Sequence, residues 1–350
     1  MPHARRLTVL CVLAGAVTAH AQLIQSQQNE IVESVSRLLL ANYVFPGEDW
    51  EGVGVQPEIP ASSEEALETA RLAALEGLGT RPTAPVVFAP GVVSVDGLSV
   101  YRGCFSPDGS AFYFFRRAAG EGESYRIHVT ELLHGAWQPA TPVDLGGDHS
   151  DLYPTLSPDG RFMVFSSYRP VPGTTTVRQA NLWFTERGTD GWSEPRYLEG
   201  LSNPDAYNPG AVWGPDDILR YKEVTWRPGR RLHLAASWTG SSFGDPRPDE
   251  AFTWAGRIEG HYVWDVTLSP DRSIAILGVS RVDARGWRGQ SDLWYARLRG
   301  GAWGAPKPIP GVNDAELSEN FPVFTPDGEE LLFVRDTAKY YKIPVSVLSP

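Results

Sequence analysis

The chain has 350 residues, of which 42% are hydrophobic and 21% are charged, so it can bury a substantial core and is not a disordered protein. Its 31 basic and 42 acidic side chains give a formal net charge of −11 at pH 7. This excess of acid, without a basic stripe to offset it, argues against nucleic acid or an anionic membrane surface as the partner.

Residues 1–21 have the pattern of a secretory signal peptide. Two arginines precede the apolar run LTVLCVLAGAV, and the tripeptide AHA provides a cleavage site before Gln22. The apolar run is too short to serve as a permanent membrane span, so we expect no integral membrane anchor. The mature protein is therefore expected in the periplasm or outside the cell.

Residues 22–82 are expected to form a small helical extension. Apolar residues at helical spacing predict one helix over 29–44. Ser62 followed by Glu65 is typical of a capping box that opens a second helix.

From residue 83 onward the sequence repeats. A Pro-Asp pair preceded by Ser, Thr or Gly recurs at spacings of 51 to 57 residues, and its aspartates are Asp108, Asp159, Asp216, Asp271 and Asp327. Two apolar, strand-like segments follow each pair, and four copies continue with an aromatic residue and a proline. About four short strands in such a unit are typical of a propeller blade.

The repeated residues have physical roles in this interpretation. Proline presets φ, aspartate bonds the turn backbone and glycine supplies a positive φ, so the triplet predicts a tight hairpin after each innermost strand. The third copy, WGPDD, departs from the pattern because it lacks the glycine. The recurring tryptophans Trp137, Trp192 and Trp303 are expected to fill the space between neighbouring blades.

The two ends of the repeat region predict how the ring closes. The fifth unit stops after its third strand, and an orphan strand at 85–97 precedes the first unit. If 85–97 supplies the missing strand of the last blade, the ring has no exposed sheet edge. The sequence thus predicts an all-β, five-bladed β-propeller over 83–350, with six blades as the alternative.

The aromatic-Ser-Pro-Asp-Gly turn followed by an apolar strand resembles the WD40-like repeat of TolB-type β-propellers, a family of exported bacterial proteins. The resemblance covers residues 85–350, about three quarters of the chain. It implies a propeller fold without implying a defined activity. TolB itself is usually described as six-bladed, which is the basis of the six-bladed alternative.

The sequence offers little that would carry catalysis. It contains no H-E-x-x-H and no P-loop, and its histidines are not paired at metal-ligand spacing. Once Cys11 leaves with the signal peptide, Cys104 has no cysteine with which to form a disulfide. We therefore expect no catalytic residue, no metal and no cofactor.

One set of positions is a candidate ligand site. An aromatic residue recurs where the chain enters each innermost strand, and in four of the five cases an acid precedes it by two or three positions. The candidate ligand-binding residues at this channel mouth are Asp151, Tyr153, Asp205, Tyr207, Glu259, Tyr262 and Glu319. Tyr101 and Phe321 complete the aromatic series.

Such a ring of carboxylates and aromatic faces suits a cationic group, a sugar or a divalent ion. In the alternative interpretation the acids bond the loop backbone and the aromatics plug the channel. Arginines near the end of the second strand could pair with these acids or bind an anion, but solvated charges at strand ends are the more usual explanation; they are Arg116 or Arg117, Arg169, Arg281 and Arg335.

These observations favour an exported, non-catalytic propeller that binds a protein, peptide or envelope glycan through one face of the ring. The alternative is a polysaccharide hydrolase or lyase, which would need two carboxylates roughly 5–10 Å apart at the channel mouth.

Overall fold

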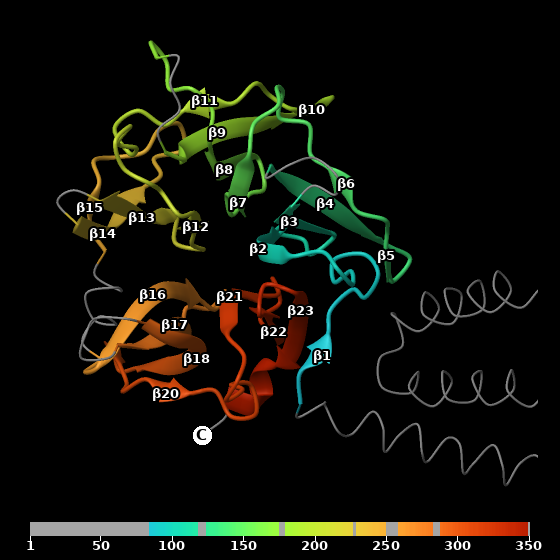
Figure 1. Ribbon diagram of the computed structural model, residues 1–350, viewed down its shortest axis with the longest axis vertical. Coiled ribbons are helices and arrows are strands. Elements are labelled where there is room, and N and C mark those ends of the chain that lie inside the picture. The colour runs from blue at the N-terminus through green and yellow to red at the C-terminus, as the bar shows by residue number, and fades with distance from the viewer. Residues whose placement is uncertain are drawn as a thin grey trace, which may run out of the picture. The chain divides into compact units, whose positions relative to one another are not determined.

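The structure is a computed structural model, and it describes residues 84–117, 124–174, 179–226, 229–249, 258–282 and 288–348 (Figure 1). The expected signal peptide at 1–21 and the expected helical extension at 22–82 lie outside the described residues.

The described residues form five antiparallel sheets around a common centre, which is the architecture of a five-bladed β-propeller (Figure 1). We number the blades 1 to 5 by their innermost strands, which are β2 (Val100–Phe105), β7 (Asp151–Leu156), β12 (Ala211–Trp213), β16 (His261–Leu268) and β21 (Glu319–Phe324). The fold prediction is confirmed, with five blades and not six.

Each blade continues outward through two longer strands. The second strands are β3 (Ala111–Arg117), β8 (Phe162–Ser167), β13 (Ile218–Trp226), β17 (Ile274–Val282) and β22 (Glu330–Arg335). The third strands are β4 (Tyr125–Leu133), β9 (Asn181–Gly188), β14 (Gly229–Ser237), β18 (Arg288–Arg299) and β23 (Lys339–Pro344). In blades 1, 2 and 4 the chain turns directly after the third strand and forms a two-residue strand that pairs antiparallel with the end of it. These short strands are β5 (Ala136–Trp137), β10 (Gly191–Trp192) and β19 (Ala302–Trp303).

The outermost strands have two residues each and follow the recurring proline; they are β6 (Thr141–Pro142), β11 (Arg196–Tyr197), β15 (Arg247–Pro248) and β20 (Lys307–Pro308). In blade 5 this place is taken by β1 (Val86–Val87), which pairs antiparallel with β23. After β23 the described chain ends in a short 3₁₀ helix, η1 (Val345–Leu348). No helix in the described part of the chain is both long and apolar enough to cross a membrane.

The Pro-Asp turns have the predicted construction. In four blades a Ser or Thr hydroxyl donates to the turn aspartate, as Ser106 Oγ does to Asp108 Oδ1 at 2.6 Å. Blade 3 replaces this bond with a bidentate pair from Arg220 to Asp216, at 2.9 and 2.7 Å. Gly214 stands where the other turns have the hydroxyl residue, because a Cβ there would meet Asp216 Oδ1 at 2.5 Å.

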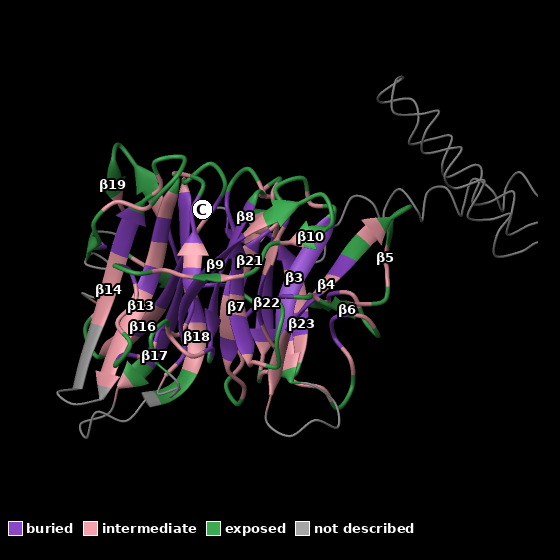
Figure 2. Ribbon diagram, turned by 90° about the horizontal axis from the view of Figure 1, so that it is seen from above, coloured by how far each residue is buried: buried purple, intermediate pink, exposed green. Residues whose placement is uncertain are grey.

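Two of the recurring tryptophans, Trp137 and Trp192, lie between neighbouring blades, as predicted. Trp192 of blade 2 packs edge-on against Tyr113 of blade 1, with the ring centroids 6.1 Å apart. Trp137 of blade 1 packs against Phe88, which follows β1 in blade 5, at 5.4 Å. Buried residues consequently run along the strands, while most exposed residues lie at the turns and outer strands (Figure 2).

Candidate binding site in the channel

Bulges in the innermost strands position the aromatic side chains at the mouth where these strands begin. The register shifts between Val100 and Gly103 in β2, and equivalent shifts occur in β7, β16 and β21. The aromatic residues in these bulges are Tyr101, Tyr153, Trp264 and Phe321. Because a bulge bends the strand and turns a side chain out of the regular alternation, it can direct a large ring toward the axis.

These four residues and Tyr207 form a set that we call the aromatic cluster, with one member from each blade. The Phe321 ring lies 6.4 Å from Tyr101, 6.3 Å from Tyr153 and 5.8 Å from Trp264, measured between centroids. The Tyr207 side chain lies beside Tyr153, and burial raises the pKa of both phenol groups. Since Tyr153 and Phe321 belong to blades that are not neighbours, their contact spans the channel. This packing corresponds to the alternative interpretation of the sequence, in which the aromatic side chains fill the channel at this end.

Asp151, a candidate ligand-binding acid, is bound by an arginine. It is 6% exposed, and its Oδ1 accepts from Arg169 Nη1 at 2.5 Å. The same arginine donates to the carbonyls of Leu145 and Gly146, both at 2.8 Å. Burial raises the pKa of Asp151, and the charge of Arg169 opposes that rise. The pair therefore ties the start of β7 to the loop that enters blade 2.

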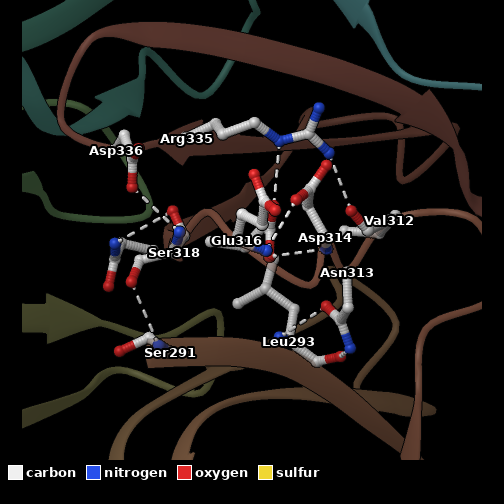
Figure 3. A network of polar contacts seen from close by, with 11 residues as sticks. Ser291, Leu293, Val312, Asn313, Asp314, Glu316, Ser318, Arg335 and Asp336 are labelled. Atoms are coloured by element: carbon white, nitrogen blue, oxygen red, sulfur yellow. Dashed lines mark hydrogen bonds and ion pairs between the residues drawn. The ribbon is translucent and has the colours of Figure 1, made fainter. Parts of the chain in front are cut away.

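Glu319 repeats this arrangement in blade 5, and Figure 3 shows its partners Arg335 and Asp314 beside Val312. It is fully buried, and its Oε1 accepts from Arg335 Nε at 2.9 Å. Arg335 also donates to the carbonyl of Val312 at 2.8 Å, and the backbone N–H of Asp314 donates to Glu319. Of the alternatives for the strand-end arginines, pairing with an acid is the one found for Arg169 and Arg335.

The other candidate residues are placed differently. Asp205 and Glu259 are exposed, unlike the two buried acids Asp151 and Glu319. Tyr262 pairs in regular register with Ser280, and blade 4 contributes Trp264 to the aromatic cluster in its place. Ligand binding at this mouth stays a prediction.

Beyond the aromatic cluster, an ion pair crosses the channel. Arg102 of blade 1 donates from Nη2 to Asp265 Oδ2 of blade 4 at 2.6 Å. The two side chains are 6% and 2% exposed, and their blades are not neighbours in the ring. Arg102 belongs to the bulge of β2 and follows Tyr101 directly, so one irregularity supplies both the ring and the cation.

A second cation reaches this part of the channel from blade 3. Lys222 Nζ donates to the carbonyl of Trp264 at 2.6 Å and lies 5.6 Å from the centroid of that ring. Burial lowers the pKa of Lys222 to about 8, with Asp265 opposing the shift and Arg102 adding to it. Arg102, Lys222 and Asp265 thus bring two basic side chains and one acidic side chain together in the channel.

The channel is open between this group and the Pro-Asp turns. A cavity of about 310 Å³ is lined by the later residues of all five innermost strands, and Arg102 is among them. Seven prolines contribute to its wall, namely the five turn prolines Pro107, Pro158, Pro215, Pro270 and Pro326 together with Pro154 and Pro322. Among the described residues, no group of three or more His, Cys, Asp and Glu is placed to hold a metal.

Sequence reasoning missed the cavity and its charged residues. Arg102 could have attracted notice as a charged residue beside the recurring Tyr101, and Asp265 as one inside an apolar strand. Their pairing had no signal in the sequence, because they are 163 positions apart in non-neighbouring blades.

The class of protein that fold and channel define is a five-bladed β-propeller. TolB from Agrobacterium tumefaciens is 19% identical with a TM-score of 0.40, over 67% of this chain and 69% of that one. The periplasmic gluconolactonase PpgL of Pseudomonas aeruginosa is 14% identical with a TM-score of 0.37, over 67% and 64% of the two chains.

The WD40 repeats of RRP9 are 11% identical with a TM-score of 0.35, over 74% of this chain and 99% of that one. No protein-family model matches the chain, and no curated protein does. The structural similarity to TolB-like, gluconolactonase and WD40 propellers is therefore distant and concerns the fold alone.

Proposed function

We propose that this chain is an exported binding protein that takes a protein, peptide or envelope glycan at the Pro-Asp end of its channel. The observation that carries the proposal is the cavity of about 310 Å³, to which all five blades contribute. Concave sites with a largely apolar wall and a few well-placed polar groups are typical of ligand binding. The opposite end is occupied by the aromatic cluster, so the Pro-Asp end is the one that offers space.

The rigidity of the surroundings supports binding at this end. Contacts between blades hold the wall in place, as where Trp213 N–H donates to Thr155 Oγ1 at 2.9 Å and Thr267 Oγ1 donates to the Pro322 carbonyl at 3.1 Å. A preformed wall lowers the entropy cost of ordering the site when ligand binds.

Export is the second element of the proposal, and it rests on the sequence. The signal-peptide pattern of residues 1–21 directs the chain to the periplasm or the outside of the cell. The partner is then a component of the cell envelope or of the medium. Intact mass of the exported protein tests this element, with Gln22 as the expected first residue.

The experiment for the binding site fills the cavity. Val212 lines it and is half-buried, so Val212→Trp would occupy the space. Leu298→Trp, at a position 38% exposed on β18, is the matched control. Thermal-shift screening of the three proteins against a hexapeptide pool and against neutral oligosaccharides should give hits with wild type and Leu298→Trp that Val212→Trp loses. Hits that Val212→Trp retains would place the site elsewhere, and no hit with wild type would count against a binding role.

A further inference from the structure

The wall of the cavity is apolar, and its hydroxyl groups are already used. Side chains such as Val212, Leu268 and Val323 line it together with the seven prolines, which have no backbone N–H to offer a ligand. The lining residues that carry a hydroxyl are Ser106, Thr155, Ser157, Thr267 and Thr325. Three of these hydroxyls donate to the aspartate of their own turn, and those of Thr155 and Thr267 are engaged in the contacts between blades described above. Because a buried polar group is unfavourable without a hydrogen-bond partner, the cavity favours an apolar group over a sugar.

The buried charges at the inner end of the cavity balance one another. Arg102 pairs with Asp265 across the channel, as described above. Arg220, which also lines the cavity, pairs with Asp216 at 2.7 Å and lies 3.7 Å from Asp249. The basic side chains of this region are Arg102, Lys222 and Arg220, and the acidic ones that interact with them are Asp265, Asp216 and Asp249. Since three positive charges meet three negative ones, the charge that a ligand prefers is decided at the rim and not at the floor.

The rim of the cavity consists of the Pro-Asp turns, and neighbouring turns lie close together. A Cβ added at Gly160 of the blade 2 turn would meet Pro107 of the blade 1 turn at 3.1 Å. A Cβ at Gly109 of blade 1 would likewise meet Pro326 of blade 5 at 3.8 Å. The turns of these blades therefore form a continuous border around their side of the opening.

This border carries more acidic than basic side chains. The four residues that begin with each turn proline include, besides Asp216, six exposed acids and two exposed bases; they are Asp108, Asp159, Asp217, Asp271, Asp327 and Glu329, and Arg161 and Arg272. Hydrogen bonds from Ser106 and Ser110 lower the pKa of Asp108 to about 2, and bonds of the same kind lower the pKa of Asp271. A border of ionised carboxylates around a low-dielectric opening attracts cations and repels anions.

We propose that the Pro-Asp end docks a basic segment of a partner protein, with one apolar side chain of that segment inserted into the cavity. Lysine or arginine side chains on either side of the inserted residue then face the turn aspartates. At about 310 Å³ the cavity is at the lower end of the range for ligand sites, which suits a single side chain with its neighbours at the rim. This inference rests on the proposed function and narrows its ligand to a cationic peptide segment.

Calorimetric titration of the full chain with pentapeptides capped at both ends tests the two parts of the proposal separately. The parent peptide has a leucine between two pairs of lysines. Replacing the leucine by serine should weaken binding roughly 10- to 100-fold, because the buried apolar side chain is lost. Replacing all the lysines by glutamine should weaken binding roughly 10-fold. The affinity of the parent peptide should also fall when the salt concentration is raised to about 0.5 M.

A rim variant tests the turn carboxylates; it is Asp108→Asn/Asp159→Asn/Asp271→Asn. Asparagine keeps an oxygen that accepts the hydroxyl hydrogen bond of the turn, so the turns should persist while three negative charges are removed. The affinity for the lysine peptide should fall roughly 10-fold, to that of the glutamine peptide. The matched control removes three exposed acids from the loops that lead into β7, β12 and β21 and should bind as wild type does; it is Asp144→Asn/Glu199→Gln/Glu316→Gln.

The cavity-filling variant Val212→Trp tests the inserted side chain. It should bind the leucine peptide no more tightly than wild type binds the serine peptide, because the space for the leucine is occupied.

Equal binding of the lysine and glutamine peptides by wild type, or of the leucine and serine peptides, would overturn the inference. So would unchanged binding of the lysine peptide by a rim variant that thermal melting shows to be folded, or no binding of the parent peptide at all. If the rim variant does not fold, the peptide comparisons on wild type still decide. The proposed function fails separately, since a neutral peptide or oligosaccharide that wild type binds and Val212→Trp does not would leave it standing.

Discussion

Ser94 and Tyr340 are 246 positions apart and are joined by two hydrogen bonds at the closure of the ring. Ser94 Oγ donates to the Tyr340 carbonyl at 3.2 Å and accepts from the Tyr340 N–H at 3.0 Å. Phe88 N–H donates to the same carbonyl at 2.8 Å. The Ser94 side chain therefore bonds both backbone groups of Tyr340 at a point of β23 that lies beyond the end of the short strand β1.

Ser94→Ala should lower the free energy of unfolding by about 1–3 kcal/mol, because it leaves a buried N–H without an acceptor. Urea denaturation followed by tryptophan fluorescence measures the change. Ser242→Ala, at an exposed position, is the control. Deletion of residues 83–97 should have a larger effect and broaden the transition, because it exposes the edge of β23. A normal cooperative transition in the deletion would contradict this account of closure.

The four predicted acids should separate into two pairs by their effect on stability. Asp151→Asn and Glu319→Gln should each cost about 3 kcal/mol, because each leaves a buried arginine without its counter-charge. Asp205→Asn and Glu259→Gln change exposed side chains and should stay within about 0.5 kcal/mol of wild type. Chemical denaturation of the four variants gives the comparison. Equal costs would mean that the arginine pairs do not hold these loops.

Phe321 should be the most sensitive position of the aromatic cluster. Phe321→Ala removes the ring at its centre and should cost about 2–4 kcal/mol. The Phe321→Gly variant loses the same ring, but glycine adopts the φ of 54° at this position without steric strain. It should therefore lower the free energy of unfolding by less than the alanine variant does. The free energies of unfolding of the two variants, measured by urea denaturation, test this order. The reverse order would show that this backbone conformation carries no penalty.

Stability should fall as the pH drops from about 6.5 to about 4. Burial lowers the pKa of His128 to about 4, and that of His233 to about 4 as well. The unfolded state then binds more protons in this range, so protonation favours unfolding by on the order of 1–3 kcal/mol per histidine.

His128→Phe should reduce this pH dependence while keeping the ring stacked on Phe114, 5.9 Å away. Urea titrations from pH 7 to pH 4 measure the slope. His134→Asn, at an exposed position with φ 51°, should leave the slope as it is in wild type. An unchanged slope in His128→Phe would assign the acid sensitivity to other groups.

The repeat made the fold predictable. The Pro-Asp turns define where each innermost strand ends, and the short fifth unit with its orphan strand predicts five blades and closure by 85–97. The candidate site could be predicted only in part from the sequence. The extra residue in β16 brings Trp264 into the cluster where spacing alone pointed to Tyr262. Bulges of this kind and contacts across a channel depend on where strands face the axis, which a linear pattern does not record.

The short strand β1 also determines where the ring opens when the chain is pulled. It joins β23 through only two residue pairs, whereas the other strands of blade 5 are six residues long. Tension arriving along the chain from residue 83 acts on β1 before it reaches any complete strand of the blade. The two residue pairs can separate one after the other, so the ring would open between β1 and β23 under a pull that leaves the other strand pairs of blade 5 intact. A propeller held by residues ahead of the ring thus has a defined place at which to give way.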